Sequence, residues 1–121
     1  MKYTINMNKE LLKYRLFLPR TIEVEIHKAE EGGFWAKIKT FPGCAVQGED
    51  IYDLIEMVNV GIQDYLEIPK KLRKDLERYE PDISSEKVRK IFEDSKHRHI
   101  EDIINQIIRN NANMEFSKVP A

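Results

Sequence analysis

The chain has 121 residues, of which 41% are hydrophobic and 34% charged, and its formal net charge is −1. This length favours one compact domain with an appendage, and the nearly balanced charge argues against a strongly basic nucleic-acid-binding protein. Because it has no apolar run of bilayer length, no secretion signal and only one cysteine, Cys44, the sequence predicts a cytoplasmic protein with no membrane segment and no internal disulfide.

The N-terminal extension, residues 1–20, is expected to contain a short strand followed by a short helix. Asn8 is a suitable N-cap for this helix, and Pro19, which lacks a backbone donor, is expected to close it. The strand would be formed by Tyr3, Ile5 and Met7, and the helix would carry Leu11, Leu12, Tyr14 and Arg15.

Residues 21–41 are typical of a β-hairpin, because apolar and polar residues alternate along two segments that Gly32 and Gly33 separate. The glycines supply the positive φ angles of the connecting loop. One register satisfies both faces of the hairpin, and a slip of one residue would break both. It places Val24 opposite Ile38, Ile26 opposite Ala36, Glu25 opposite Lys37 and Glu23 opposite Lys39. On the polar face, His27 is expected to pack against Trp35, which stays partly exposed.

A turn at residues 41–44 leads to a short third strand at residues 45–47 and then to an amphipathic helix. This helix is expected to run from about Asp50 to about Glu67, and Pro69 ends it. Its apolar stripe and the apolar face of the hairpin need each other for burial. A three-stranded antiparallel sheet packed on one helix is therefore one α+β folding unit. The stripe consists of Ile51, Leu54, Ile55, Val58, Ile62, Tyr65 and Leu66.

Charge is distributed unevenly along the chain. Residues 1–69 contain 8 Lys and Arg against 11 Asp and Glu, a net of −3, whereas residues 70–121 contain 12 against 10, a net of +2. Between Thr40 and Pro69 there is no Lys or Arg, yet acidic residues recur. They are Glu49, Asp50, Asp53, Glu56, Asp64 and Glu67. An acidic helix face of this kind is either solvated or complementary to a basic partner.

Residues 70–121 are expected to form a helical C-terminal extension. A charged segment, residues 70–80, would add a helical turn or two before Pro81 breaks it. Ser84 or Ser85 would then cap a second helical region. The inward-facing residues of the first segment would be Leu72, Leu76 and Tyr79.

Two features of this extension point to partners. The isoleucines within residues 100–108 lie on one stripe that must be buried, so we expect an interaction surface and a homo-oligomer. A basic window is the best candidate for phosphate contacts, although an ordinary charged helix surface is the favoured explanation of it. Its residues are Lys87, Arg89, Lys90, Lys96 and Arg98. Residues 114–119 could add an edge strand.

Four segments, taken in chain order, resemble the motifs of the HicB-like antitoxin family. They are Glu31-Gly32-Gly33-Phe34-Trp35-Ala36-Lys37-Ile38, Phe41-Pro42-Gly43-Cys44, Gln47-Gly48-Glu49 and the helix at residues 51–67. Each segment is short, and it is their order and spacing within residues 21–69 that is specific. Two departures stand out: the helix has Asp53-Leu54-Ile55 where the family usually has Glu-Ala-Leu, and residues 70–121 match no DNA-binding module of the family.

The resemblance implies a partial, degenerate ribonuclease H-like fold without nuclease activity. It also implies a place in a type II toxin–antitoxin system, with a partner of the HicA kind. Such a toxin is a small RNA-cleaving protein with a double-stranded-RNA-binding fold. Many family members carry a C-terminal DNA-binding module that represses their own operon, so operator DNA is a further expected partner, whereas other members are solitary.

Catalytic and metal-binding alternatives are weaker. Glu23 and Glu25 share a strand face, but the lysines expected opposite them would neutralise a two-metal nuclease site. His97 and His99 point in different directions on a helix and have no cysteine nearby, so no metal site is expected. Cys44 has no local histidine to activate it and is expected to pack as a small buried residue. We therefore expect no enzyme activity, no cofactor and no catalytic residue.

The first hypothesis is an antitoxin that docks on a small basic toxin and blocks its RNA site. The alternatives are a nucleic-acid-binding transcriptional regulator acting through the C-terminal helices, or a solitary HicB-like binding protein. The expected partner-binding residues are Trp35, Asp53, Glu56 and Asp64, and those for nucleic acid are Lys87, Arg89, Lys90 and Arg98. The residues expected to shape the scaffold are Gly32, Gly33, Phe34, Pro42, Gly43, Cys44 and Gly48.

Overall fold

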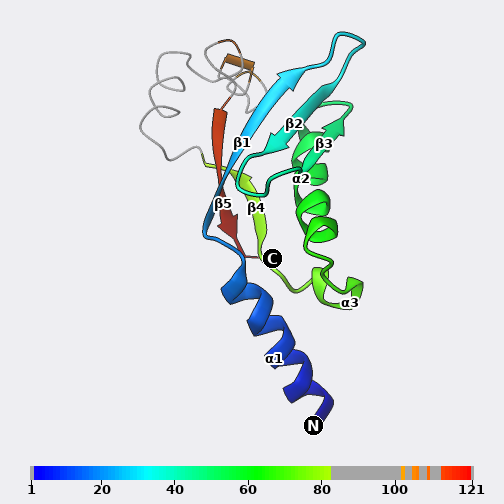
Figure 1. The fold of residues 1–121 in the computed structure, drawn as a ribbon, viewed down its shortest axis with the longest axis vertical. Helices are drawn as coiled ribbons and strands as arrows, with labels where there is room; N and C mark the ends of the chain where they lie inside the picture. Colours follow the sequence, from blue (N-terminus) through cyan, green and yellow to red (C-terminus); the bar gives the residue numbers. More distant parts are fainter. Residues whose placement is uncertain (1, 83–101, 103–104, 107–108, 110–112, 121) are drawn as a thin grey trace.

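The computed structural model describes residues 2–82, 102, 105–106, 109 and 113–120. They form an α+β fold in which one helix packs across one face of a five-stranded antiparallel sheet of order β3-β2-β1-β5-β4 (Figure 1). The elements in chain order are α1 (Lys2–Phe17), β1 (Thr21–Lys28), β2 (Phe34–Ile38), β3 (Ala45–Gly48), α2 (Ile51–Tyr65), α3 (Lys70–Arg73), β4 (Arg78–Pro81) and β5 (Asn113–Val119).

The β1–β2 hairpin has the expected register. Val24 pairs with Ile38 and Glu25 with Lys37, and the apolar members of the hairpin are almost completely buried. Alternation of apolar and polar residues thus fixed both the register and the choice of buried face. β3 then adds to β2, with Val46 opposite Ala36.

The expectation of a three-stranded sheet is wrong, because β4 and β5 extend it to five strands. β5 is a strand, as residues 114–119 indicated, but it lies between β1 and β4 rather than at an edge. β4 forms where helix was expected. Its four residues carry too little periodicity to distinguish the two structures, and pairing with β5 decides in favour of the strand. The sheet therefore draws on residues from both sides of Pro69.

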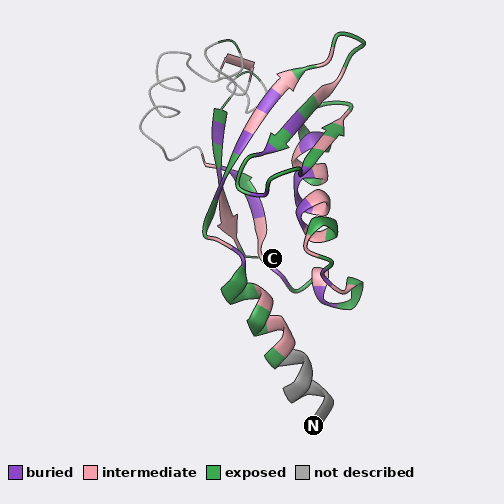
Figure 2. Cartoon of the chain, in the orientation of Figure 1, coloured by how far each residue is buried: buried purple, intermediate pink, exposed green. Residues whose placement is uncertain are grey.

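Helix α2 covers the apolar face of the sheet, as its stripe predicts. Ile51, Leu54, Val58 and Ile62 are buried against the strands, and Figure 2 shows the buried positions on the side of the helix that faces the sheet. Tyr65 departs from the expectation, because it is 45% exposed and its hydroxyl donates to the Pro42 carbonyl at 2.8 Å.

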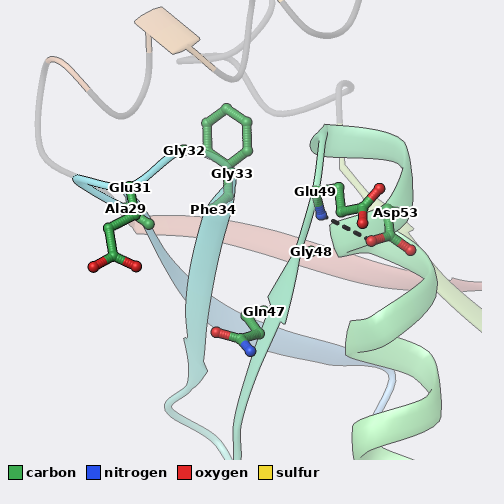
Figure 3. Close-up of a pocket in the computed structure, with 9 residues that line it drawn as sticks. All are labelled: Ala29, Glu31, Gly32, Gly33, Phe34, Gln47, Gly48, Glu49 and Asp53. Atoms are coloured by element: carbon green, nitrogen blue, oxygen red, sulfur yellow. Dashed lines mark hydrogen bonds between the residues drawn. The ribbon is translucent and has the colours of Figure 1, made fainter.

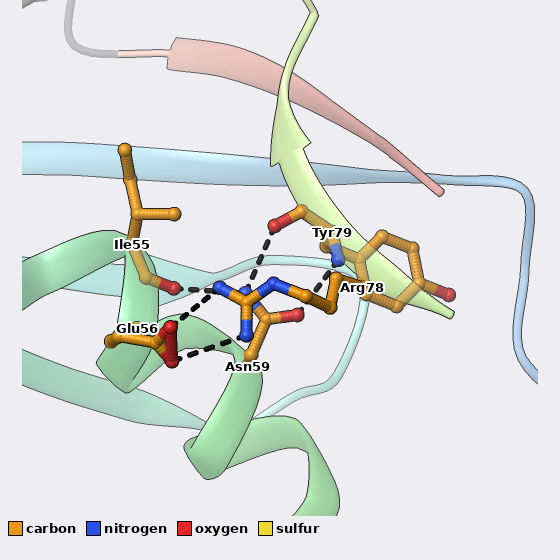
Figure 4. A network of polar contacts seen from close by, with 5 residues as sticks. All are labelled: Ile55, Glu56, Asn59, Arg78 and Tyr79. Atoms are coloured by element: carbon orange, nitrogen blue, oxygen red, sulfur yellow. Dashed lines mark hydrogen bonds and ion pairs between the residues drawn. The ribbon is translucent and has the colours of Figure 1, made fainter. Parts of the chain in front are cut away.

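Asn59 is a buried polar residue of the core and ties α2 to β4 (Figure 4). Its Nδ2 donates to the carbonyls of Ile55 and Tyr79, both at 2.9 Å, and its Oδ1 accepts from the Tyr79 amide at 2.7 Å. Asn59 is polar, and yet it lies on the buried side of the helix with 4% of its surface exposed. The buried Leu72, Leu76 and Tyr79 agree with the inward orientation expected of them.

The N-terminal extension forms one helix rather than a strand followed by a helix. α1 projects away from the sheet, and its C-terminal end at Phe17 is the end that lies next to the sheet (Figure 1). Arg15 anchors its last turn, since the guanidinium donates to the Asp75 carbonyl at 3.0 Å. Leu12, Leu16 and Phe17 remain more than half exposed.

Most of the predicted C-terminal helical region lies outside the described residues. This applies to Lys87, Arg89, Lys90 and Arg98 and to most of the isoleucine stripe. The helical extension, the homo-oligomer and contact with operator DNA therefore stay predictions. Among the residues that the structure describes, no helix combines the length and apolarity needed to cross a bilayer.

Candidate functional site

Three of the four resemblance segments meet in an open recess of about 500 Å³ at one end of the sheet (Figure 3). The hairpin loop forms one wall, the end of β3 forms the floor, and the first turn of α2 forms the other wall. The residues around it are Ala29, Glu31, Gly32, Gly33, Phe34, Gln47, Gly48, Glu49 and Asp53. We call this feature the acidic recess, because its charged residues within the described part of the chain are all carboxylates.

Two glycines allow the walls of the acidic recess to approach each other. Gly33 has a φ of 77°, and a Cβ there would lie 2.7 Å from the Gly48 carbonyl oxygen. A Cβ on Gly48 would lie 2.5 Å from the Leu54 amide nitrogen. Both obstacles are backbone atoms, which cannot move aside as a side chain can. Both positions therefore require glycine for reasons of space.

Two aspartate side chains fix the helix side of the recess by accepting from backbone amides. Asp50 Oδ1 accepts from the Asp53 amide at 2.7 Å, and Asp53 Oδ2 accepts from the Glu49 amide at 2.8 Å. Asp50 is the N-cap of α2, and the side chain of Asp53 accepts from the residue before the N-cap rather than from the N-cap amide that a capping box would use. Asp53 thus orients the loop and also places negative charge at the rim, whereas the exposed Glu49 carboxylate has no ion-pair partner among the described residues.

Glu56 and Asp64, the other acids expected to bind a partner, lie farther along α2, outside the recess. Arg78 pairs with Glu56 through its two terminal nitrogens, Nη2 at 2.7 Å and Nη1 at 3.2 Å from the carboxylate oxygens (Figure 4). Arg73 pairs with Asp64 at 2.8 Å. Residues 41–68 contain no Lys or Arg, but the folded chain brings arginines from after Pro69 to pair with these two acids.

Trp35 lies on the open face of the sheet and is 37% exposed. As expected, it stacks on His27, with ring centroids 4.3 Å apart. His27 Nε2 donates in turn to Glu25 Oε2 at 3.0 Å, and this hydrogen bond holds the pKa of Glu25 below its ordinary value. Glu23 pairs with Lys39 at 3.6 Å, as the register predicts. Trp35 is paired across the strands with Gln47, which lines the recess, but Trp35 itself does not line it.

The remaining scaffold residues lie at the other end of β2 and β3. Pro42 and Gly43 form the turn there, with Gly43 at a φ of 85°. Cys44 is buried, and its burial raises the pKa of the thiol, which matches the packing role expected of it. Within the described residues, no three His, Cys, Asp or Glu side chains gather as metal ligands would.

Sequence reasoning missed Glu31 and Glu49 as members of a site. Both stand next to glycines of the resemblance motifs, and that adjacency was the available signal. That both line the recess depends on the β2–β3 pairing, which sets Phe34 opposite Gly48 and so brings the two loops together.

The chain is similar to the UPF0150 protein of Archaeoglobus fulgidus, with 35% identity over 49 residues that make up 40% of this chain and 71% of that protein. No family model and no solved structure matches the chain. The length of the similarity is close to that of the segment that carries the resemblance motifs. On this similarity, the chain belongs to the UPF0150 family, which is a HicB-like family.

Proposed function

We propose that the chain is a HicB-like antitoxin that binds a small, basic, RNA-cleaving toxin and occludes its RNA site. In this proposal the acidic recess receives a basic side chain of the toxin. The chain itself performs no chemistry and acts in the cytoplasm.

The observation that carries the proposal is the contrast in charge compensation along one side of the molecule. Glu31, Glu49 and Asp53 surround a concavity whose described lining contains no base, whereas Glu56 and Asp64 are each paired with an arginine. An unpaired carboxylate attracts an approaching cation more strongly than one already in an ion pair. A protein that cleaves RNA must present basic groups to the phosphates, and an acidic recess complements such a surface.

Isolation of the partner tests this proposal. A tagged chain is expressed in its native host, and the proteins retained are identified, produced separately and assayed for RNA cleavage. The expected result is a small basic protein that degrades RNA and loses this activity when the chain is added in equimolar amount.

Charge reversal then tests the site. The double variant Glu31→Lys/Glu49→Lys should inhibit cleavage at least about tenfold less well than the natural chain, because it places cations where the toxin brings its own. Glu67→Lys/Glu80→Lys makes the same change in net charge at exposed positions away from the recess, and it should inhibit as the natural chain does. A partner that does not cleave RNA would refute the antitoxin role, and equal inhibition by both variants would refute the assigned site.

A further inference from the structure

Strand β3 is an edge of the sheet, and half of its backbone groups have no partner among the described residues. The Ile38 amide donates to the Cys44 carbonyl at 2.9 Å, which fixes the alternation along β3. Val46 therefore directs its amide and carbonyl toward β2, while Ala45 and Gln47 direct theirs away from the sheet. Both of these outward residues are exposed. This edge is open to a further strand.

The opposite edge, β4, is closed. Asn59 binds both the amide and the carbonyl of Tyr79, so its side chain occupies the place that another strand would take. Arg78, which precedes Tyr79 in β4, forms an ion pair with Glu56 of α2. Natural sheets commonly protect their edges in such ways, and the two edges of this sheet differ in that respect.

An apolar groove of about 520 Å³ runs beside β3, between that strand and α2. Met57, Val60 and Gly61 form its helix side and Val46 its strand side. The helix approaches closely here, since a Cβ on Gly61 would lie 2.4 Å from Val46 Cγ1. The groove continues the surface that the free edge begins, so one occupant would cover both.

The charge of the β3 edge and its groove indicates which kind of partner binds there. Its residues from Gly43 to Gln47 are uncharged, and its ionised member on the helix side, Asp64, is already paired with Arg73. Self-association across a two-fold axis brings like charges together, which a neutral surface avoids. In a chain with 34% charged residues, an uncharged edge and groove fit a second copy of the same surface better than a basic or acidic peptide.

We propose that β3 pairs in antiparallel fashion with β3 of a second copy, with Val46 on the two-fold axis. Ala45 then lies opposite Gln47 of the second copy, and all the outward amides and carbonyls of both residues are satisfied. Two five-stranded sheets join into one continuous sheet. The two Val46 side chains meet across the axis, and the Val60 side chains of the two α2 helices approach each other over the groove.

The natural full-length chain provides the first test. Sedimentation equilibrium is measured from about 1 μM to about 1 mM, the range in which weak interfaces dissociate. The amide exchange of Ala45 and Gln47 is followed by NMR over the same range. Dimerisation should slow exchange at both amides by about tenfold or more as concentration rises, because only the dimer gives them acceptors.

Charge at Val60 provides the second test. Val60→Lys and Val60→Glu should each be monomeric, because the dimer would bring two like charges together at the groove. An equimolar mixture of the two variants should regain the dimer. Tyr52→Lys, at an exposed position on another side of α2, should dimerise as the natural chain does.

Each of the other outcomes contradicts the proposal. A chain that remains monomeric to the highest concentration with fast exchange at Ala45 and Gln47 has no such contact. A dimer that leaves both amides unprotected, or that persists unchanged in Val60→Lys, uses another surface. Protection of the two amides that appears only when a different protein is added would assign the edge to that protein. The amide measurement needs no substitution, so it holds even if a Val60 variant fails to fold.

Discussion

Helix α2 has two parts, the first turn with Asp53 and the half that follows from Glu56 onward, and their carboxylates differ in how they are paired. At the first turn, Asp53 binds a backbone amide and Glu49 has no ion-pair partner among the described residues, so both leave negative charge at the rim of a recess. Farther along, Glu56 and Asp64 each meet an arginine that enters from a later part of the chain. In the sequence, acidic residues stand both at the start of the helix, at Glu49 and Asp53, and farther along it, at Glu56 and Asp64. What separates a candidate binding surface from an ordinary charged surface is the three-dimensional position of Arg73 and Arg78.

The same contrast extends to what each half of the helix does for the fold. The later half is locked to β4 by Asn59 and by the Glu56–Arg78 pair. The first half is held by close backbone packing at Gly48 and by its cap. The following predictions distinguish the two halves by the kind and size of the loss that each substitution causes.

The largest expected effect is at the locked half. Asn59→Ala removes both partners of the buried Tyr79 backbone groups. The free energy of unfolding should fall by about 3 kcal/mol, since each buried unsatisfied group costs roughly 1–3 kcal/mol. Urea unfolding followed by circular dichroism measures this. Gln63→Ala removes an amide of similar size on the same helix whose side chain makes no hydrogen bond within the described residues, and it should cost less than about 0.5 kcal/mol.

The recess half should respond to bulk rather than to lost hydrogen bonds. Gly48→Ala would place a Cβ against the Leu54 backbone and should cost about 2 kcal/mol, as overpacking against rigid atoms does. Gly61→Ala is the comparison, because its obstacle is the Val46 side chain and helix propensity favours alanine there. Its unfolding free energy should fall by about 1 kcal/mol or less, because the Val46 side chain must shift while alanine favours the helix. Equal losses in the two variants would contradict the distinction between rigid and movable neighbours.

A smaller effect is expected from the ion pair itself. Arg78→Ala, Glu56→Ala and the double variant form a thermodynamic cycle, and the coupling energy should be about 0.5 kcal/mol, because both side chains are substantially exposed. The coupling should shrink in 1 M salt. A coupling above about 2 kcal/mol would show that the pair, rather than Asn59, fastens α2 to β4.

The parts of the fold that could be predicted are those whose partners lie close in sequence. The β1–β2 register and the apolar stripe of α2 follow from periodicity because each segment carries its own complete pattern. β4 and β5 could not be placed in this way. Residues 78–81 become a strand only through pairing with residues 113–119, and a segment of four residues does not reveal a partner that distant.

The residues of the candidate site also fall into those that the sequence alone could identify and those that needed the fold. The glycines at positions 33 and 48 were recognised as scaffold residues, but the acids beside them could be grouped only after β2 and β3 were paired. Glu56 and Asp64 were expected to be free because the helix window contains no base. Only the folded chain shows that the compensating arginines come from α3 and β4.

The open face of the sheet offers a third arrangement, a carboxylate whose partner is two residues away. His27 donates to Glu25 and lowers the pKa of that carboxyl, so the contact stabilises the fold above the ordinary Glu pKa and is lost as the pH falls through the folded-state value. His27→Ala should raise the pKa of Glu25 toward its ordinary value, as measured by a ¹³C carboxyl titration. Lys37→Ala should raise it less, since Lys37 acts only through its charge. If the pKa of Glu25 is unchanged in His27→Ala, the hydrogen bond from His27 is not the cause of the low pKa. The carboxylates of α2, whose partners are distant in sequence, would then be the ones in this fold that are set by their pairing.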